Sequence, residues 1–169
     1  MTVLDNIMYV VCARSSTIRL YNTDTGSPLD AVIDVEGMRD PHDIVVCRDD
    51  RQLYVAHWRD IWRVSCDDHS YVKWLSTGST TDAFTAYTLS LTSRRLLVTS
   101  YPSRRLHQYS TTDRQLLRVV ELPQYVNFVH HGVETTRGTF VVCHQGTSQN
   151  QQLQPAVSEL FSLGLRSGK

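Results

Sequence analysis

Residues 40–64, DPHDIVVCRDDRQLYVAHWRDIWRV, bring together side chains that could do chemistry. The stretch holds two histidines, five acidic residues, a cysteine and two tryptophans. Carboxylates are the ligands that calcium prefers, and imidazoles suit transition metals. The segment is therefore either a metal or hydrolase site, or one structural unit that recurs along the chain.

The patterns of other common active sites are absent from the sequence. The four cysteines, Cys12, Cys47, Cys66 and Cys143, form no Cys-x-x-Cys pair, which excludes a zinc ribbon. We expect them to be small buried residues with free thiols. The chain has no Gly-x-Ser-x-Gly elbow and no glycine loop that would hold a phosphate. We therefore predict no catalytic residue.

Composition narrows the class of partner and the compartment. The 169 residues include 17 Lys and Arg and 17 Asp and Glu, so the formal net charge is zero. This balance argues against nucleic acid or an anionic membrane as a partner. No apolar stretch is long enough for a membrane helix, and the N-terminus MTVLDNIMYVVCARSS lacks the basic region of a signal peptide. With the free thiols, these features predict an intracellular, cytoplasmic protein.

Short apolar runs separated by Asp, Ser, Thr, Asn and Gly dominate the chain, which is typical of many antiparallel strands. The runs repeat. Aligning IMYVV, QLYVA, RLLVT and TFVVC on their central residues gives spacings of 45, 43 and 44 residues. The acidic turns around Asp24, Asp68 and Asp113 give spacings of 44 and 45. Four strands in such a period make one blade of a β-propeller, so we predict an all-β, propeller-type repeat protein.

The period assigns strands to blades of about residues 1–38, 39–80, 81–123 and 124–146. The first visible blade begins at its second strand, and the others begin at their first. The predicted strands are 7–13, 17–22 and 29–35; 42–47, 52–58, 60–65 and 71–75; 84–91, 95–101, 105–110 and 116–122; and 128–135 and 139–145. The Gln- and Ser-rich tail, 147–169, is expected to be partly disordered, with a stray strand or a short helix at AVSELFSL.

The repeats resemble those of NHL and YVTN-type propellers. The residues that carry the likeness are PHDI before the second blade, LYVA in its second strand, and the Asp-x-x-Thr-Gly type of turn in YNTDTG. The resemblance covers roughly residues 5–146 and implies a propeller fold. It does not fix a function, because propellers include both binding proteins and enzymes.

About three and a half blades are too few for a closed ring. Three explanations stay open. The chain is part of a longer propeller, or two copies complete one ring, or the arc stays open and is capped by its tail. In the first case, further blades of a longer chain would cover the sheet edges at the two ends of the arc. In the second case, another copy of the chain would cover them.

In this geometry one face of the arc carries the turns between second and third strands and the loops between blades. We expect a ligand-binding rim there. Its predicted members are His42, His57, Trp58, Arg59, Tyr101, Arg104, His130, His131 and His144.

We expect a non-catalytic module that binds a protein or peptide at this rim, without a cofactor. One alternative is a metal-dependent sugar-lactone hydrolase of the propeller type, in which calcium would lie in the channel. Asp43 and Asn127 are weak candidate ligands, and FTAYTLSL in the third blade adds only hydroxyls. The other alternative is RNA binding in the manner of some NHL propellers, since arginines accompany aromatic residues at the rim.

Overall fold

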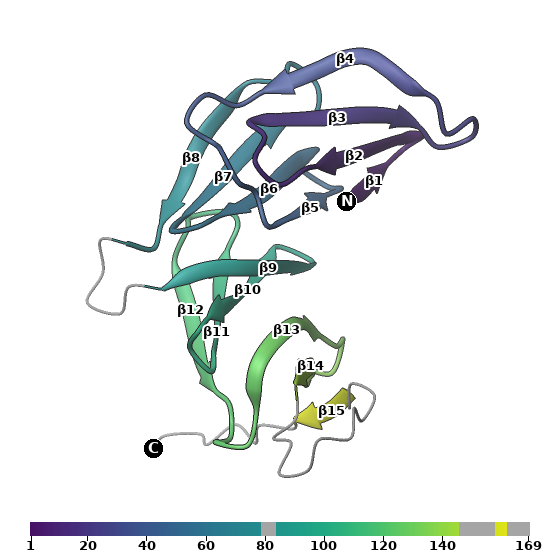
Figure 1. The fold of residues 1–169 in the computed structure, drawn as a ribbon. Coiled ribbons are helices and arrows are strands. Elements are labelled where there is room, and N and C mark those ends of the chain that lie inside the picture. Colours follow the sequence, from purple (N-terminus) through teal and green to yellow (C-terminus); the bar gives the residue numbers. More distant parts are fainter. Residues whose placement is uncertain (79–83, 146–157, 162–169) are drawn as a thin grey trace.

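The chain forms four antiparallel β-sheets that follow one another along an open arc (Figure 1). The computed structural model describes residues 1–78, 84–145 and 158–161. For residues 127, 145 and 158–161 it describes the backbone alone. No helix occurs in the described residues, and in particular none that is long and apolar enough to cross a membrane. The fold is therefore all-β, as predicted.

Each sheet is a meander in which the strands pair in chain order. The first sheet contains β1 (Thr2–Leu4), β2 (Ile7–Val11), β3 (Thr17–Asn22) and β4 (Pro28–Asp34). The second contains β5 (Asp43–Cys47), β6 (Gln52–His57), β7 (Asp60–Ser65) and β8 (Tyr71–Ser76). The third contains β9 (Thr85–Thr92), β10 (Arg95–Tyr101), β11 (Arg105–Ser110) and β12 (Leu116–Glu121). The fourth contains β13 (Asn127–Glu134), β14 (Phe140–Gln145) and β15 (Ser158–Phe161).

The first sheet corrects the predicted start of the repeats. The prediction began this blade at its second strand, but β1 pairs with β2, with Val3 opposite Met8. The first blade is therefore complete with four strands. The three-residue strand Thr2–Leu4 is too short to show the alternation of apolar and polar residues that identifies a strand in sequence.

The turns between third and fourth strands explain why the acidic landmarks repeat. In each of the first three sheets, a side-chain oxygen at the end of the third strand accepts hydrogen bonds from backbone amides two and three residues later. The acceptors are Asn22, Ser65 and Ser110. These local bonds favour a turn at the same point of every blade. In the second turn, hydrogen bonds with the hydroxyls of Ser65 and Ser70 lower the pKa of Asp68 to about 2.

Apolar clusters between successive sheets hold the arc together. Tyr9 and Ile18 of the first sheet pack against Leu53 and Val55 of the second. The second and third sheets enclose Tyr54 and Trp74, whose rings meet edge to face at 5.1 Å. Each cluster is the contact between one face of a sheet and the opposing face of the next, which is how blades of a propeller pack.

The contact between the third and fourth sheets also contains a buried carboxylate. The Glu134 side chain is 1% exposed and forms ion pairs with Arg95 at 3.4 Å and with Arg118 at 2.5 Å. It also accepts a hydrogen bond of 2.7 Å from the Gln108 amide. Arg118 in turn lies 4.5 Å from the Phe140 ring centroid. Both oxygens of the buried acid are therefore satisfied by the neighbouring blade.

All four cysteines are free, but their environments differ from the expectation of uniform burial. Cys47 and Cys66 are buried, Cys143 is half-buried and Cys12 is exposed. Burial raises the pKa of the Cys47 and Cys66 thiols. Cys12 is exposed because it follows β2, in the turn to β3 rather than in a strand.

Candidate binding site

One face of the arc carries the turns between second and third strands and the loops that join the sheets; we call it the loop face. It includes the predicted rim residues of the second and third sheets, His42, His57, Trp58, Arg59, Tyr101 and Arg104. The structure brings several of them together, but it also adds two aromatic residues that the sequence did not single out. The resulting arrangement is a line of rings.

Five rings from three sheets form this line, which we call the aromatic row. Trp58 and His42 come from the second sheet, Tyr87 and Tyr101 from the third, and Phe128 from the fourth. Successive ring centroids are 5.7, 5.6, 5.8 and 6.1 Å apart in the order Trp58, His42, Tyr87, Tyr101, Phe128. Each ring therefore touches the next, and together they form a continuous apolar band.

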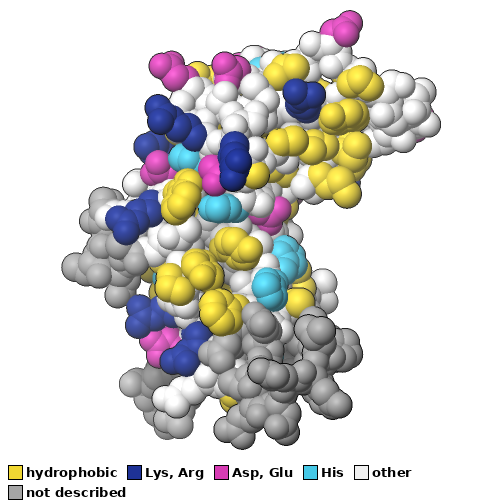
Figure 2. Space-filling view, in the orientation of Figure 1, with side chains coloured by type: hydrophobic (Ala, Val, Ile, Leu, Met, Phe, Trp, Pro, Cys, Tyr) yellow, Lys and Arg dark blue, Asp and Glu magenta, His cyan; other side chains and the backbone are white. Residues whose placement is uncertain are grey.

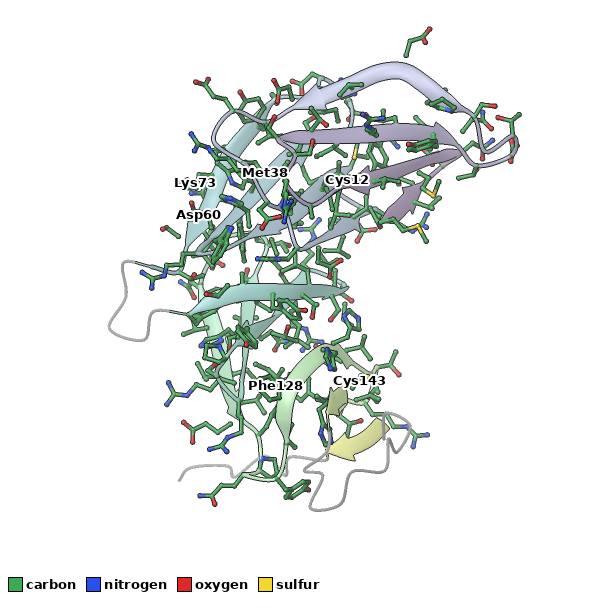
Figure 3. All side chains as sticks on the ribbon, in the orientation of Figure 1. Cys12, Met38, Asp60, Lys73, Phe128 and Cys143 are labelled. Atoms are coloured by element: carbon green, nitrogen blue, oxygen red, sulfur yellow. The ribbon has the colours of Figure 1, made fainter. Side chains whose placement is uncertain are left out.

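The band is accessible to a partner. Trp58 is 53% exposed, Tyr101 43% and Phe128 51%. Figure 2 shows hydrophobic and histidine side chains along the middle of the visible face, with Lys and Arg side chains beside them. Phe128 lies next to β13 in Figure 3. Large rings exposed side by side are typical of binding surfaces rather than of an ordinary protein surface.

The turn that carries Trp58 is fixed by bonds to neighbouring segments. His57 pairs with Asp60, so Trp58 and Arg59 form a two-residue hairpin turn. The Trp58 carbonyl accepts a hydrogen bond of 2.7 Å from the Ala86 amide at the start of β9, which joins the second and third sheets. The Arg59 carbonyl accepts bonds from the amide and hydroxyl of Thr77. The turn that carries the first ring of the row is therefore fixed by backbone hydrogen bonds to two separate segments.

Both ends of the aromatic row have an unusual backbone conformation. Trp58 has φ of 50° and Phe128 has φ of 48°. The left-handed region disfavours bulky side chains and suits glycine. The other non-glycine residues with positive φ in the described chain are Asp5, Arg14, Arg51, His69, Ser93 and Arg114. None of these is a large aromatic, so the two strained aromatic positions are both in the row.

His57 lies behind the row rather than in it. Its Nε2 accepts a hydrogen bond of 3.3 Å from the Arg39 amide, and its Nδ1 is buried. Burial lowers the pKa of this imidazole, which keeps it neutral and able to accept that bond. His57 therefore positions the loop between the first and second sheets, and its contact is with the protein.

The charges around the row leave two arginines available. Asp60 forms an ion pair of 2.8 Å with Lys73, and the two side chains lie together in Figure 3. Asp40 accepts a hydrogen bond from the Arg14 amide. By contrast, no ion pair within the described residues involves Arg39 or Arg59, and both are exposed. The guanidinium groups of Arg39 and Arg59 therefore have no ion-pair partner among the described residues, and the Asp40 carboxylate has none either.

A groove adjoins this end of the row. It lies between the β2–β3 turn and the loop after β4, and has a volume of about 820 Å³. Its lining is mixed and includes Met38 beside Arg14, Arg39, Glu36 and Asp40. Arg39 also donates its amide to His57, the residue before Trp58 in the chain.

Of the two weak calcium candidates, only Asp43 has a side chain in the described part of the chain. Asp43 accepts a backbone hydrogen bond through each oxygen, from Ile44 at 2.8 Å and from Leu89 of the third sheet at 2.9 Å. Its carboxylate therefore links two sheets. The side chain of Asn127 lies outside the described part of the chain. No group of three or more His, Cys, Asp or Glu side chains that could hold a metal ion occurs among the described residues.

Three of the predicted rim histidines are elsewhere. His144 is 3% exposed because its register opposite Val129 turns it towards the third sheet, so it is buried and not part of the aromatic row. His131 is exposed opposite Cys143, on the face of the fourth sheet that points away from the third. His130 is exposed between two register shifts of β13, outside the row.

The sequence reasoning missed Tyr87 and Phe128. Both lie near the beginning of the first strand of a blade, β9 and β13 respectively. This is the part of a blade that borders the channel of a propeller. That position, combined with an aromatic residue, was the signal that could have identified them.

Comparison with known proteins identifies the fold. No protein-family model matches the sequence, and no curated protein is significantly similar to it. The structure is similar to that of Kuenenia stuttgartiensis hydrazine synthase, with a TM-score of 0.67 and 14% sequence identity. The similarity covers 92% of this chain and 47% of the other, so the chain spans about half the length of that protein. At this identity the likeness concerns the fold alone. Together with the four successive antiparallel sheets, it identifies the chain as a β-propeller-type repeat fold arranged as an incomplete ring.

Proposed function

We propose that the chain is a non-catalytic binding module that recognises a protein or peptide segment along the aromatic row. The observation that carries this proposal is the continuous line of five rings, three of them about half exposed, across three sheets. Aromatic anchors contribute most of the energy of many protein interfaces. The resemblance of PHDI, LYVA and YNTDTG to NHL and YVTN-type repeats supports a binding role, because many such propellers are binding proteins.

The chemistry of the surface indicates the kind of peptide. An extended segment would place apolar or proline side chains on the rings, as Pro-rich segments do in aromatic-lined grooves. Acidic groups of the same segment would lie beside Arg39 and Arg59, whose guanidinium groups form no ion pair with the described residues. We therefore infer a partner segment that is both apolar and acidic.

The test is a selection of phage-displayed peptides on the wild-type protein, followed by binding measurements with the enriched peptides as synthetic probes. Trp58→Gly removes one ring and places at φ of 50° the residue that this conformation favours. We expect affinity to fall at least about tenfold, as for a typical aromatic anchor. The free energy of unfolding should change by less than about 1 kcal/mol, because relief of backbone strain offsets the lost packing.

The matched control is Tyr71→Ala, which removes an aromatic side chain of 39% exposure from β8, outside the row. It should leave the affinity unchanged. Enriched peptides that bind the Trp58→Gly protein as tightly as the wild type would place the site elsewhere. A selection that enriches no sequence would contradict peptide binding itself.

Single-stranded RNA is the second candidate, because Arg59 adjoins Trp58 and Arg104 follows Tyr101 closely in the chain. Stacking rings and cations bind single strands without strong sequence preference. A fluorescent oligouridylate distinguishes the two functions. Binding of this probe that weakens steeply with salt and is lost in Trp58→Gly would favour RNA over a peptide.

A further inference from the structure

The first sheet has one covered face and one open face. Residues such as Tyr9 and Ile18 pack against the second sheet. Strand alternation and pairing place a second set on the opposite face: Val3, Met8, Val10, Arg19, Tyr21 and Val32. Val3 is 37% exposed and Val32 is 53% exposed. Figure 2 shows hydrophobic side chains gathered over this sheet at the upper right.

The same positions are buried in the second sheet. The strand pairing shows which positions of the two sheets correspond. The pair Val3 and Met8 of the first sheet corresponds to Val46 and Leu53 of the second. The pair Val10 and Arg19 corresponds to Val55 and Trp62. The members of this set in the second sheet, Val46, Leu53, Val55, Trp62 and Val64, all belong to the cluster that packs on the first sheet.

The third sheet repeats the arrangement. There Leu89, Leu96, Val98 and Tyr109 occupy the corresponding face and pack on the second sheet. Every later blade therefore uses this face to dock on the blade before it. The open face of the first sheet carries apolar residues at the same registers, except that Arg19 lies where the second sheet has Trp62, and no sheet of the described residues docks on it.

No sheet of the described residues packs on the opposite side of the fourth sheet. Its inner face, with Phe140 and Val142, packs against the third sheet. On the other face of β13 and β14, Val133 is 38% exposed, opposite Val141, and His131 lies opposite Cys143. In each contact between successive sheets of the chain, the corresponding face of one sheet packs against the docking face of the next sheet. The two ends of the arc therefore present the two complementary halves of one repeated contact.

We propose that two copies of the chain associate head to tail, with the open face of the first sheet of each copy against the open face of the fourth sheet of the other. The pair would contain four blades from each copy and two identical interfaces. A head-to-tail contact is self-limiting when the rotation closes, and propellers of up to about eight blades close into rings. A second copy fits these two open faces because it supplies the same contact between sheets that the chain already forms three times.

The experiment is the solution mass of the full chain by light scattering over a dilution series. The wild type should show a reversible equilibrium between 19.3 kDa and twice that mass. Val10→Glu should weaken this association at least about 100-fold, because Val55 and Val98, at the corresponding positions of the docked sheets, are fully buried, so each pair would bury two unpaired carboxylates. The control is Val119→Glu, the same substitution at a position of the third sheet that is 41% exposed opposite His107. It should leave the association unchanged.

A third variant tests the head-to-tail order. Val133→Glu alters only the fourth sheet, yet it should weaken the association as Val10→Glu does, because each interface joins the first sheet of one copy to the fourth sheet of the other. Circular dichroism melts must show that each variant is folded. A wild type that is monomeric at all concentrations, a ladder of species larger than the pair, or association insensitive to Val133→Glu would each overturn the proposal. None of these readouts depends on the aromatic row, so the proposed binding function is tested separately.

Discussion

Glu134 shows how a single charged residue can be built into a blade contact. Its side chain is 1% exposed and interacts with Arg95, Arg118 and Gln108, all from the third sheet. A buried ion pair adds little net stability compared with apolar packing, but removal of one partner leaves an uncompensated charge. The residue therefore favours one register between the third and fourth sheets, since a shift of the sheet would leave the buried carboxylate without its partners.

We expect Arg118→Ala to lower the free energy of unfolding by about 2 to 3 kcal/mol, because Glu134 then keeps one arginine and the contact with Phe140 is lost. The value lies at the low end for a buried pair because the Arg118 side chain is 33% exposed. Urea denaturation measures the change. Arg105→Ala, which removes an exposed ion pair with Glu121 in the same sheet, should cost less than about 1 kcal/mol. Equal losses in the two variants would show that the buried network has no special role.

At the scale of the strands, Asp43 links β5 to β9 through backbone amides rather than through side-chain packing. One oxygen accepts the amide of Ile44, and the other accepts that of Leu89 in the next sheet. Such a bond fixes the height of one sheet relative to its neighbour. It also places β9, and with it Tyr87, in line with His42 of the second sheet.

Asp43→Ala should therefore lower the free energy of unfolding by about 1 to 2 kcal/mol and accelerate hydrogen exchange at the Leu89 amide, which loses its acceptor. Asp43→Asn keeps one acceptor oxygen and should have a smaller effect. The measurement is amide exchange by nuclear magnetic resonance, with a calcium titration in parallel. A calcium-dependent rise in the wild-type melting temperature that disappears in Asp43→Ala would support the calcium-dependent hydrolase instead.

The strands and their grouping were largely predictable, because a period of about 44 residues appears independently in the strands and in the turns. The element that differed is β1, which has only three residues and therefore gives a weak local signal. β15 lies within AVSELFSL, where a stray strand or a short helix was expected. β15 pairs with β14 in register, with Phe140 opposite Phe161. The rest of the tail, and any disorder expected there, lies outside the described residues.

The candidate site was predictable only in part. Trp58 and Tyr101 could be assigned to the loop face because turns and strand ends are visible in the sequence. The side on which His144 and Phe128 lie depends on two register shifts between β13 and β14. Bulges reverse the alternation of side chains, and the local composition of this strand does not predict them. His57 was predicted to bind a ligand, and in the structure its Nε2 accepts a hydrogen bond from the Arg39 amide.

At the scale of the whole molecule, the sheets differ in how many neighbours stabilise them. The second and third sheets are each covered on both faces, while the first and fourth have one open face. In repeat proteins, stability is approximately a sum of units and nearest-neighbour contacts. The end blades should therefore open more readily than the middle ones.

Hydrogen exchange followed by mass spectrometry checks this expectation in the monomeric Val10→Glu protein. Peptides from β5–β12 should exchange more slowly than peptides from β1–β4 and β13–β14. In the wild type at high concentration, the difference should shrink if two copies cover the end faces. Uniform exchange along the monomeric chain would show that the arc unfolds as one cooperative unit.

The aromatic row spans three sheets, and this has a consequence for how the chain would respond to a ligand. The spacing between Tyr101 and Phe128, 6.1 Å between ring centroids, depends on the angle between the third and fourth sheets. A ligand that lies on both rings is thus sensitive to the curvature of the arc. Closing the arc into a ring would fix that curvature before the ligand binds. The free energy of binding would then no longer include the cost of ordering the third and fourth sheets relative to each other. By reciprocity, an occupied row would favour ring closure by the same free energy by which ring closure favours ligand binding, so that ligand would promote assembly.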